Sequence, residues 1–359
     1  MAFLLVSAFV LASVQDAPVP TVSRLESDFL SQRRQITSGI VRVNSTFTYY
    51  QNGAKAKESA TKSTVWFDGE KIRRDVRHNY DQPPGTTDTT YREITCLADD
   101  RYISWTDRVL ADGGKVVVDL TTDVKLLAPA DLRQTYNPRL LGTSPVDSFN
   151  LAQASLETTI GRSDRSPPTL RSVRWRNLDC WKIEYSCRNG LSVRAWVAPE
   201  RGNSFVRLEA LRHGERSADT AESSIECDVK PVAGTNFWFP VRYVYESKLN
   251  GQLVRSEVAQ IEIEKLNKRL DPQVFSPLDM DIPAGTYVQS RPADPRGTLV
   301  WDGKNFVPAK ALQRGPGSNG PTAFGTERRV LLLAASVGLA LVGSFASYRY
   351  FRKPVLRSP

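Results

Sequence analysis

Apolar and polar residues alternate along several stretches of this 359-residue chain. A period of two places one side of a strand in a core and the other in water, as in antiparallel sheets. The three clearest alternating sets are Val41, Val43, Phe47 and Tyr49; Trp181, Ile183, Tyr185 and Cys187; and Phe237, Phe239, Val241, Tyr243 and Tyr245.

Turn-forming dipeptides lie between the alternating runs. Asn-Gly and Asp-Gly pairs favour the tight turns of β-hairpins, so we predict roughly ten strands joined mainly by hairpins. Pro240 inside its run indicates an edge strand or a bulge. The predicted hairpin turns are Asn52-Gly53, Asp68-Gly69, Asp112-Gly113, Asn189-Gly190 and Asn250-Gly251.

Helical patterns are few. Residues 23–36 begin with a capping box formed by Ser23 and Glu26 and carry an apolar stripe. Residues 147–161 carry a second stripe that includes Phe149 and Leu156, and a shorter helix is predicted within 130–141. Since sheet and helices must bury their apolar surfaces together, we expect these helices, with Phe149 and Leu156, on the concave face of a curved sheet.

The C-terminal region has an uncharged stretch, Val330 to Ser347. As a helix it reaches about 27 Å, close to the roughly 30 Å hydrocarbon core of a bilayer. The alternative is a buried core helix, which would usually show a polar stripe that this segment lacks. Aromatic and basic residues follow the stretch, as expected at a membrane surface. We predict a transmembrane helix over 330–347 and a basic cytoplasmic tail over 348–359.

The N-terminal residues predict export. An apolar run from Ala2 to Val14 is too short to span a membrane and precedes polar residues, which is typical of a signal peptide, here assigned to residues 1–17. The chain is therefore predicted to be a single-pass membrane protein whose N-terminal body is extracytoplasmic, in the periplasm or at the cell surface. That body is assigned to residues 22–289, and the Pro/Gly-rich residues 290–329 are predicted to be a linker. Within the linker, residues 298–307 could form a small hairpin around Asp302-Gly303.

The sequence gives no pattern for catalysis, for a metal site or for a cofactor. His78 and His213 lie far apart in polar surroundings and are interpreted as exposed loop residues. Acidic clusters such as Asp99-Asp100 and Asp279 with Asp281 are interpreted as solvated turns. We therefore predict that the protein is not an enzyme and holds no cofactor or metal.

The cysteines and the net charge bear on disulfide formation and on the class of binding partner. Four cysteines, Cys96, Cys180, Cys187 and Cys227, fit either two disulfides or buried free thiols. The formal charge of +9 could suggest nucleic acid. The predicted export of the body argues against nucleic-acid binding. Basic runs such as residues 70–77 are interpreted as the solvent-facing sides of strands.

The order of elements resembles a known family. An initial helix leads into a long strand, then "TVWFDGEKIRRDVR" and "YREITCLADDRYISW" follow, and the body ends in "VFSPLDMDIPAGTYVQS". This order is similar to that of the periplasmic lipoprotein carriers of the LolA and LolB type, and to the N-terminal domain of RseB-type sigma-factor regulators. The resemblance implies a half-open β-barrel with helices as a lid over an apolar cavity. Arg73 matches the position of an arginine that helps to hold the carrier's lid, although the preceding Arg-Pro is absent.

The predicted fold is therefore mainly β, a large curved antiparallel sheet with a few lid helices and one C-terminal transmembrane helix. Its predicted function is to hold a lipid, an acyl chain or another apolar ligand, including a lipoprotein, while anchored in the membrane, because a tethered chain cannot shuttle between membranes. The alternative is an envelope sensor or interaction module that docks a protein partner, and no nucleic acid is expected. The predicted ligand-binding residues are Phe47, Phe67, Trp105, Trp181, Tyr185, Phe239, Tyr243, Phe149, Leu156 and Arg73.

Overall fold

A computed structural model describes residues 19–80, 90–107, 117–122, 166–186, 191–213 and 220–312. The chain divides into two compact units, Met1–Ala309 and Lys310–Pro359, and nearly all described residues belong to the first. The predicted helices over 130–141 and 147–161, the signal peptide and the membrane span lie outside the described residues. Within the described part of the chain, no helix is both long and apolar enough to cross a membrane.

The described elements are mostly strands. Helical segments are α1 (Val22–Arg34), the 3₁₀ turns η4 (Pro199–Arg201), η5 (Pro272–Phe275) and η6 (Pro277–Met280), and α4 (Ala309–Leu312). The strands in the first half of the chain are β1 (Ser38–Gln51), β2 (Ala54–Asp68), β3 (Lys71–Tyr80), β4 (Tyr91–Ala98), β5 (Arg101–Thr106) and β6 (Val117–Thr121). The remaining strands are β7 (Thr169–Trp175), β8 (Leu178–Ser186), β9 (Leu191–Ala198), β10 (Ser204–His213), β11 (Thr220–Pro231), β12 (Trp238–Leu249), β13 (Gln252–Leu266), β14 (Tyr287–Arg291), β15 (Leu299–Trp301) and β16 (Phe306–Pro308).

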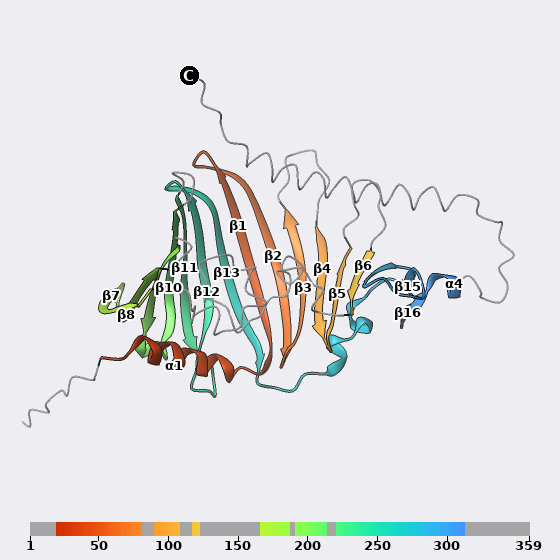
Figure 1. The fold of residues 1–359 in the computed structure, drawn as a ribbon, viewed down its shortest axis with the longest axis horizontal. Helices are drawn as coiled ribbons and strands as arrows, with labels where there is room; N and C mark the ends of the chain where they lie inside the picture. The colour runs from red at the N-terminus through yellow and green to blue at the C-terminus, as the bar shows by residue number, and fades with distance from the viewer. Residues whose placement is uncertain are drawn as a thin grey trace, which may run out of the picture. The chain divides into compact units, whose positions relative to one another are not determined.

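All described strands form one large, open, curved sheet (Figure 1). Its order is β16-β15-β14-β6-β5-β4-β3-β2-β1-β13-β12-β11-β10-β9-β8-β7, sixteen strands, which is more than the roughly ten predicted. Two runs of neighbouring strands, β1–β6 and β7–β13, join where β1 pairs with β13. The sheet is not purely antiparallel as predicted, because β14 pairs with β6 in parallel.

Three of the predicted turns lie in the described residues, and all three connect neighbouring strands. Asn52-Gly53 and Asn250-Gly251 have positive φ at both positions, the geometry of a type I′ hairpin. Gly69 also has positive φ, between β2 and β3. Pro240 is confirmed to lie at a bulge, since the β11–β12 register shifts between Asp228 and Val229.

Helix α1 begins one residue earlier than predicted. Its N-cap is Thr21, whose side chain accepts a hydrogen bond from the Arg24 backbone N–H at 3.2 Å, so the predicted Ser23 capping box is wrong. Leu25 and Phe29 are buried as the stripe predicts. Figure 1 shows the helix lying across the ends of β8–β13.

The folded body extends beyond the predicted boundary at Gln289. The predicted hairpin around Asp302-Gly303 is present as β15 and β16, and β15 also pairs with β14. Leu299 and Trp301 are 1% and 2% exposed, so residues up to Pro308 belong to the packed body and not to a linker. Isolated short hairpins are marginal, and pairing with a larger sheet provides the missing support.

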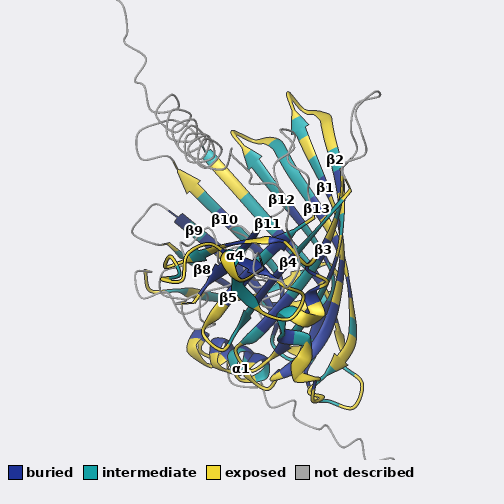
Figure 2. Ribbon diagram, turned by 90° about the vertical axis from the view of Figure 1, so that its right-hand side faces the viewer, coloured by how far each residue is buried: buried dark blue, intermediate teal, exposed yellow. Residues whose placement is uncertain are grey.

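Two hydrophobic clusters occupy the two faces of the sheet. Figure 2 shows that buried positions recur along the strands of the sheet. The first face, which we call the α1 face, carries Val41, Val65 and Phe67 and packs against α1. The other face, the opposite face, carries Ile40 and Trp66 and packs against the segment Leu270–Ile282. Because neighbouring residues of a strand point to opposite sides, β1 and β2 contribute to both clusters.

Candidate functional site

Six of the predicted site residues lie on the α1 face. Phe67 and Phe239 are fully buried, and Phe47 and Tyr243 are 6% and 2% exposed. Trp181 and Tyr185 are half-buried and pack against the same cluster. These six residues share one continuous face from β2 to β8, as period-two alternation predicts.

Two predicted site residues lie on the opposite face, which corrects the prediction. Trp105 pairs with Val118 and packs with Ile94 in the second cluster. The guanidinium of Arg73 lies 4.9 Å from the ring centroid of Trp66, also on the opposite face. Alternation within β4 and β5 is weak because both faces are covered, so it could not assign their sides. Phe149 and Leu156 lie outside the described residues.

The α1 face carries a buried carboxyl group that the sequence analysis missed. Glu257, 2% exposed, lies on β13 between Phe47 of β1 and Tyr245 of β12 in the strand register. The Tyr243 hydroxyl donates a hydrogen bond to Glu257 Oε1, and Arg255 Nη2 lies 3.6 Å from Glu257 Oε2. Glu257 alternates along the strand with Ala259 and Ile261, so it points to the same side as these apolar residues. A charged residue at an apolar position of the alternating pattern was the signal that could have revealed it.

Aromatic rings surround the neighbouring arginine. The Arg255 guanidinium lies 5.1 Å from the ring centroid of Phe47, 5.6 Å from that of Tyr245 and 5.9 Å from that of Tyr49. Cation–π contacts of this kind hold a guanidinium against apolar surface. The middle of the α1 face therefore combines aromatic surface with a small polar centre.

Burial raises the pKa of the Glu257 carboxyl above its ordinary value. The hydrogen bond from Tyr243 and the charge of Arg255 act in the other direction but are smaller effects. A carboxyl group in such surroundings favours its protonated form, which can donate a hydrogen bond.

We expect Glu257→Gln to stabilise the protein at alkaline pH and to have little effect at acidic pH. Since the pKa of Glu257 is higher in the folded than in the unfolded chain, its contribution is fully present below pH 4.5, the ordinary value, and is lost as the pH rises through the raised pKa. The neutral amide avoids this loss, so a gain of about 1–3 kcal/mol is expected at pH 8. Urea unfolding at pH 4 and pH 8 measures it, with exposed Glu262→Gln on the same strand as control. An equal effect of Glu257→Gln at both pH values would contradict the assignment.

Arg73 holds the η5–η6 segment against the opposite face of the sheet, whereas the family resemblance implied that it holds a helical lid. Its Nη1 donates to the Val274 carbonyl at 2.8 Å and to Asp279 Oδ2 at 2.6 Å, and its Nη2 donates to the Asp279 carbonyl at 2.8 Å. Arg73 is 3% exposed, so the expectation that this run of basic residues faces solvent is wrong at this position. Asp279 is engaged in this pairing and is not a simply solvated turn residue.

A second arginine reinforces the same attachment. Arg92 Nε donates to Asp75 Oδ1 at 2.9 Å, and Arg92 Nη1 donates to Asp281 Oδ2 at 3.0 Å. Both carboxylates raise the pKa of Arg92, with the hydrogen bond to Asp75 as the largest cause. Together the two arginines fix η5 and η6 against β3 and β4.

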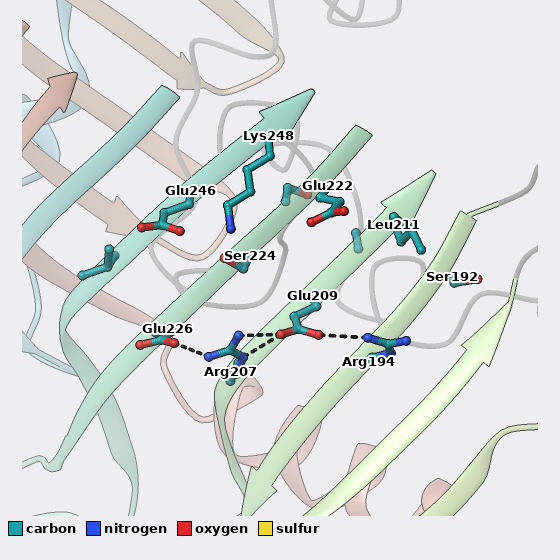
Figure 3. Close-up of a pocket in the computed structure, with 13 residues that line it drawn as sticks. Ser192, Arg194, Arg207, Glu209, Leu211, Glu222, Ser224, Glu226, Glu246 and Lys248 are labelled. Atoms are coloured by element: carbon teal, nitrogen blue, oxygen red, sulfur yellow. Dashed lines mark hydrogen bonds and ion pairs between the residues drawn. The ribbon is translucent and has the colours of Figure 1, made fainter. Parts of the chain in front are cut away.

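A polar groove of about 360 Å³ crosses β9–β12 (Figure 3). Arg207 pairs with Glu226 and Glu209 at its base, and Arg194 Nη1 lies 3.6 Å from Glu209 Oε2. Its charged side chains therefore largely neutralise one another. This groove has the character of a solvated strand face.

The histidines and the cysteines that the structure describes add no reactive group. His78 lies half-buried in β3, stacked on Tyr91 at 4.4 Å between ring centroids, which corrects the loop prediction, whereas His213 is exposed at the end of β10. Cys96, Cys180 and Cys227 are buried thiols whose pKa values burial raises to about 12, 11 and 12. Cys187 lies outside the described residues. Among the described residues, no group of three or more His, Cys, Asp or Glu side chains is placed to hold a metal ion.

Comparison with known proteins gives matches among solved structures. The chain is similar to a LolA superfamily protein from Nitrosomonas europaea, with 14% identity, 72% of this chain and 98% of that chain covered, and a TM-score of 0.39. It is similar to a DUF1329 family protein from Desulfovibrio piger, with 9% identity, coverage of 73% and 100%, and a TM-score of 0.41. A domain from Vibrio parahaemolyticus, whose name refers to outer membrane lipoprotein sorting, matches with 10% identity, coverage of 71% and 97%, and a TM-score of 0.40.

These matches include the LolA-type proteins that the sequence resembles. At such identities and TM-scores they carry no inference about function. No protein-family model matches the chain, and no curated protein matches it.

Proposed function

We propose that this chain is a non-enzymatic, extracytoplasmic binding protein that holds an acyl chain or another apolar ligand along the α1 face. The supporting observation is the buried Glu257 carboxyl between aromatic side chains of β1 and β12. Ligand sites are mainly apolar, with a few polar groups that fix orientation, and perturbed pKa values concentrate at such sites.

Each part of this face has a distinct role in the proposal. Aromatic side chains such as Phe47 and Tyr185 contact the chain of the ligand, and each buried methylene contributes about 0.8 kcal/mol. Protonated Glu257 donates a hydrogen bond to a carbonyl or ester oxygen of the ligand. Helix α1 closes one end of the face, where Phe29 meets Phe205 with 4.6 Å between ring centroids.

The proposal includes the membrane anchor and the export signal predicted from the sequence. A tethered body would hold or receive a ligand at its own membrane instead of carrying it between membranes. The predicted anchor is residues 330–347, with the body outside and residues 348–359 inside.

We expect the full-length chain to bind a fluorescent fatty-acyl probe saturably, and Trp181→Arg to weaken this binding at least about tenfold, equivalent to about 1.4 kcal/mol. Trp181 is half-buried on the α1 face, so the added charge would meet the ligand chain. Val258→Arg is the matched control, because Val258 adjoins Glu257 but points to the opposite side of β13 and is 37% exposed. Circular dichroism checks that each variant is folded. Equal binding by both variants would contradict a site on the α1 face, and the absence of saturable binding would favour an envelope interaction module.

A further inference from the structure

A second cavity lies on the opposite face, away from the residues of the proposed site. It measures about 550 Å³ and is bounded by β4–β6, the η5–η6 segment and the β15–β16 hairpin. Pockets of about 300–1,000 Å³ are the usual size of small-molecule sites. None of the described core residues of the α1 face lines it.

The floor of this cavity is apolar. Ile103 and Leu120 reach it from β5 and β6, and Phe275 and Trp301 reach it from the covering segments. Trp301 packs against Phe306 with 4.9 Å between ring centroids, which supports that wall. A hydrocarbon chain is the type of group that such a floor favours.

The rim of the cavity is cationic. Four basic side chains (Lys71, Arg101, Arg296 and Lys304) and two acidic ones (Asp99 and Asp294) line it, and the carboxylate of Asp302 acts electrostatically on Lys304 beside it. Together these groups leave a net charge of +1. Lys71 pairs with Asp99 at 2.7 Å, and Arg296 pairs with Asp294 at 2.9 Å. Arg101 and Lys304 are exposed, and the acidic group that acts electrostatically on Lys304 is Asp302 of its own turn.

Local turns hold the rim in place. Asp302 Oδ1 accepts hydrogen bonds from the backbone N–H groups of Lys304 and Asn305, both at 2.7 Å. Asp294 Oδ1 accepts from the backbone N–H of Arg296 at 2.8 Å. The positions of the Lys304 and Arg296 backbones are therefore set before any ligand arrives, which lowers the cost of ordering a site.

We infer that this cavity binds an amphiphile with one acyl chain and an anionic head. The chain contacts Ile103, Leu120 and Trp301, and the head, a carboxylate or a phosphate, lies between Arg101 and Lys304. An anion there neutralises the excess positive charge of the rim. This site is independent of the proposed site around Glu257.

Photo-crosslinking to the full-length chain in lipid nanodiscs tests the inference. Three diazirine probes share one acyl chain and end in a carboxylate, in a lysophospholipid phosphate or in a neutral alcohol. We expect either or both anionic probes to label peptides of β5 and β15 at least about fivefold more than the alcohol, since a fivefold ratio needs only about 1 kcal/mol. Which anionic probe labels better identifies the head group.

Variants at the rim and in the floor locate the labelling in this cavity. Arg101→Glu combined with Lys304→Glu is expected to reduce labelling of β5 and β15 about tenfold, and Leu120→Trp, which fills the floor, is expected to reduce it similarly. Arg174→Glu, an exposed charge reversal on β7, is the control. If Leu120→Trp does not fold, the rim variant alone decides the result.

Equal labelling by the alcohol probe, or labelling unchanged by the rim variant, would overturn the inference. Trp181→Arg is expected to leave this labelling intact, so the two sites can fail separately.

Discussion

Phe29→Ala is expected to lower the free energy of unfolding by about 3–5 kcal/mol, the range for a buried phenylalanine. Phe29 is 2% exposed on α1 and meets Phe205 edge-to-face at 4.6 Å. The guanidinium of Arg33, itself buried, lies 5.0 Å from the Phe29 ring centroid and 5.1 Å from that of Phe239. Removing the Phe29 ring would leave a cavity beside α1. It would also remove one of the two aromatic rings that the buried Arg33 guanidinium contacts.

Urea unfolding of the full-length chain in detergent measures this loss. Exposed Ser27→Ala on the same helix is the control and is expected to change stability by less than about 0.5 kcal/mol. If Phe29→Ala unfolded at the same urea concentration as the wild type, α1 would not be part of the packed core.

Arg73→Leu is expected to destabilise the protein by about 2–4 kcal/mol and to release the η5–η6 segment. Three hydrogen bonds to a charged group would be lost, and the partly buried carbonyl of Val274 would lose its donor. The Asp279 side chain is 54% exposed and can be solvated, which keeps the loss below that of a fully buried ion pair. Limited proteolysis is expected to show faster cleavage within residues 272–281.

Arg73→Lys gives a sharper comparison. Lysine keeps the charge but lacks the planar fork that reaches two acceptors at once, so part of the loss should remain. Asp279→Asn is expected to cost less than Arg73→Leu, because the two carbonyl contacts persist. Unchanged proteolysis of Arg73→Leu would contradict the role of Arg73 in holding this segment.

The sequence predicted the sheet well where only one face of a strand is apolar. In β1, Val41, Val43 and Phe47 are buried and Arg42, Asn44 and Thr46 are exposed, as alternation requires. The turns Asn52-Gly53 and Asn250-Gly251 were predictable because both central residues need positive φ.

Prediction failed where distant segments cover the second face. In β4, Ile94, Thr95 and Cys96 are all buried, so alternation disappears and Trp105 of the neighbouring strand could not be assigned to a side. The cover comes from residues near Phe275, far along the chain, and a local pattern cannot reveal such a contact. Arg73 contacts this same distant segment, through Val274 and Asp279, on the opposite face of the sheet.

The candidate site was only partly predictable. Phe47 and Tyr243 were chosen for their phase and do lie beside Glu257, but the carboxyl itself was overlooked because charged residues are usually solvated. The role of these residues in binding stays a prediction.

Native mass spectrometry of the full-length chain, released gently from its own membrane, tests the central proposal most directly. We predict a protein species heavier than the polypeptide by the mass of one acyl-containing molecule. Measured in the combined Arg101→Glu, Lys304→Glu variant, in which the second cavity is disabled, this species should be lost when Trp181→Arg is added and retained when Val258→Arg is added. In that background, a bare polypeptide mass, or an adduct that Trp181→Arg leaves intact, would contradict a ligand site on the α1 face.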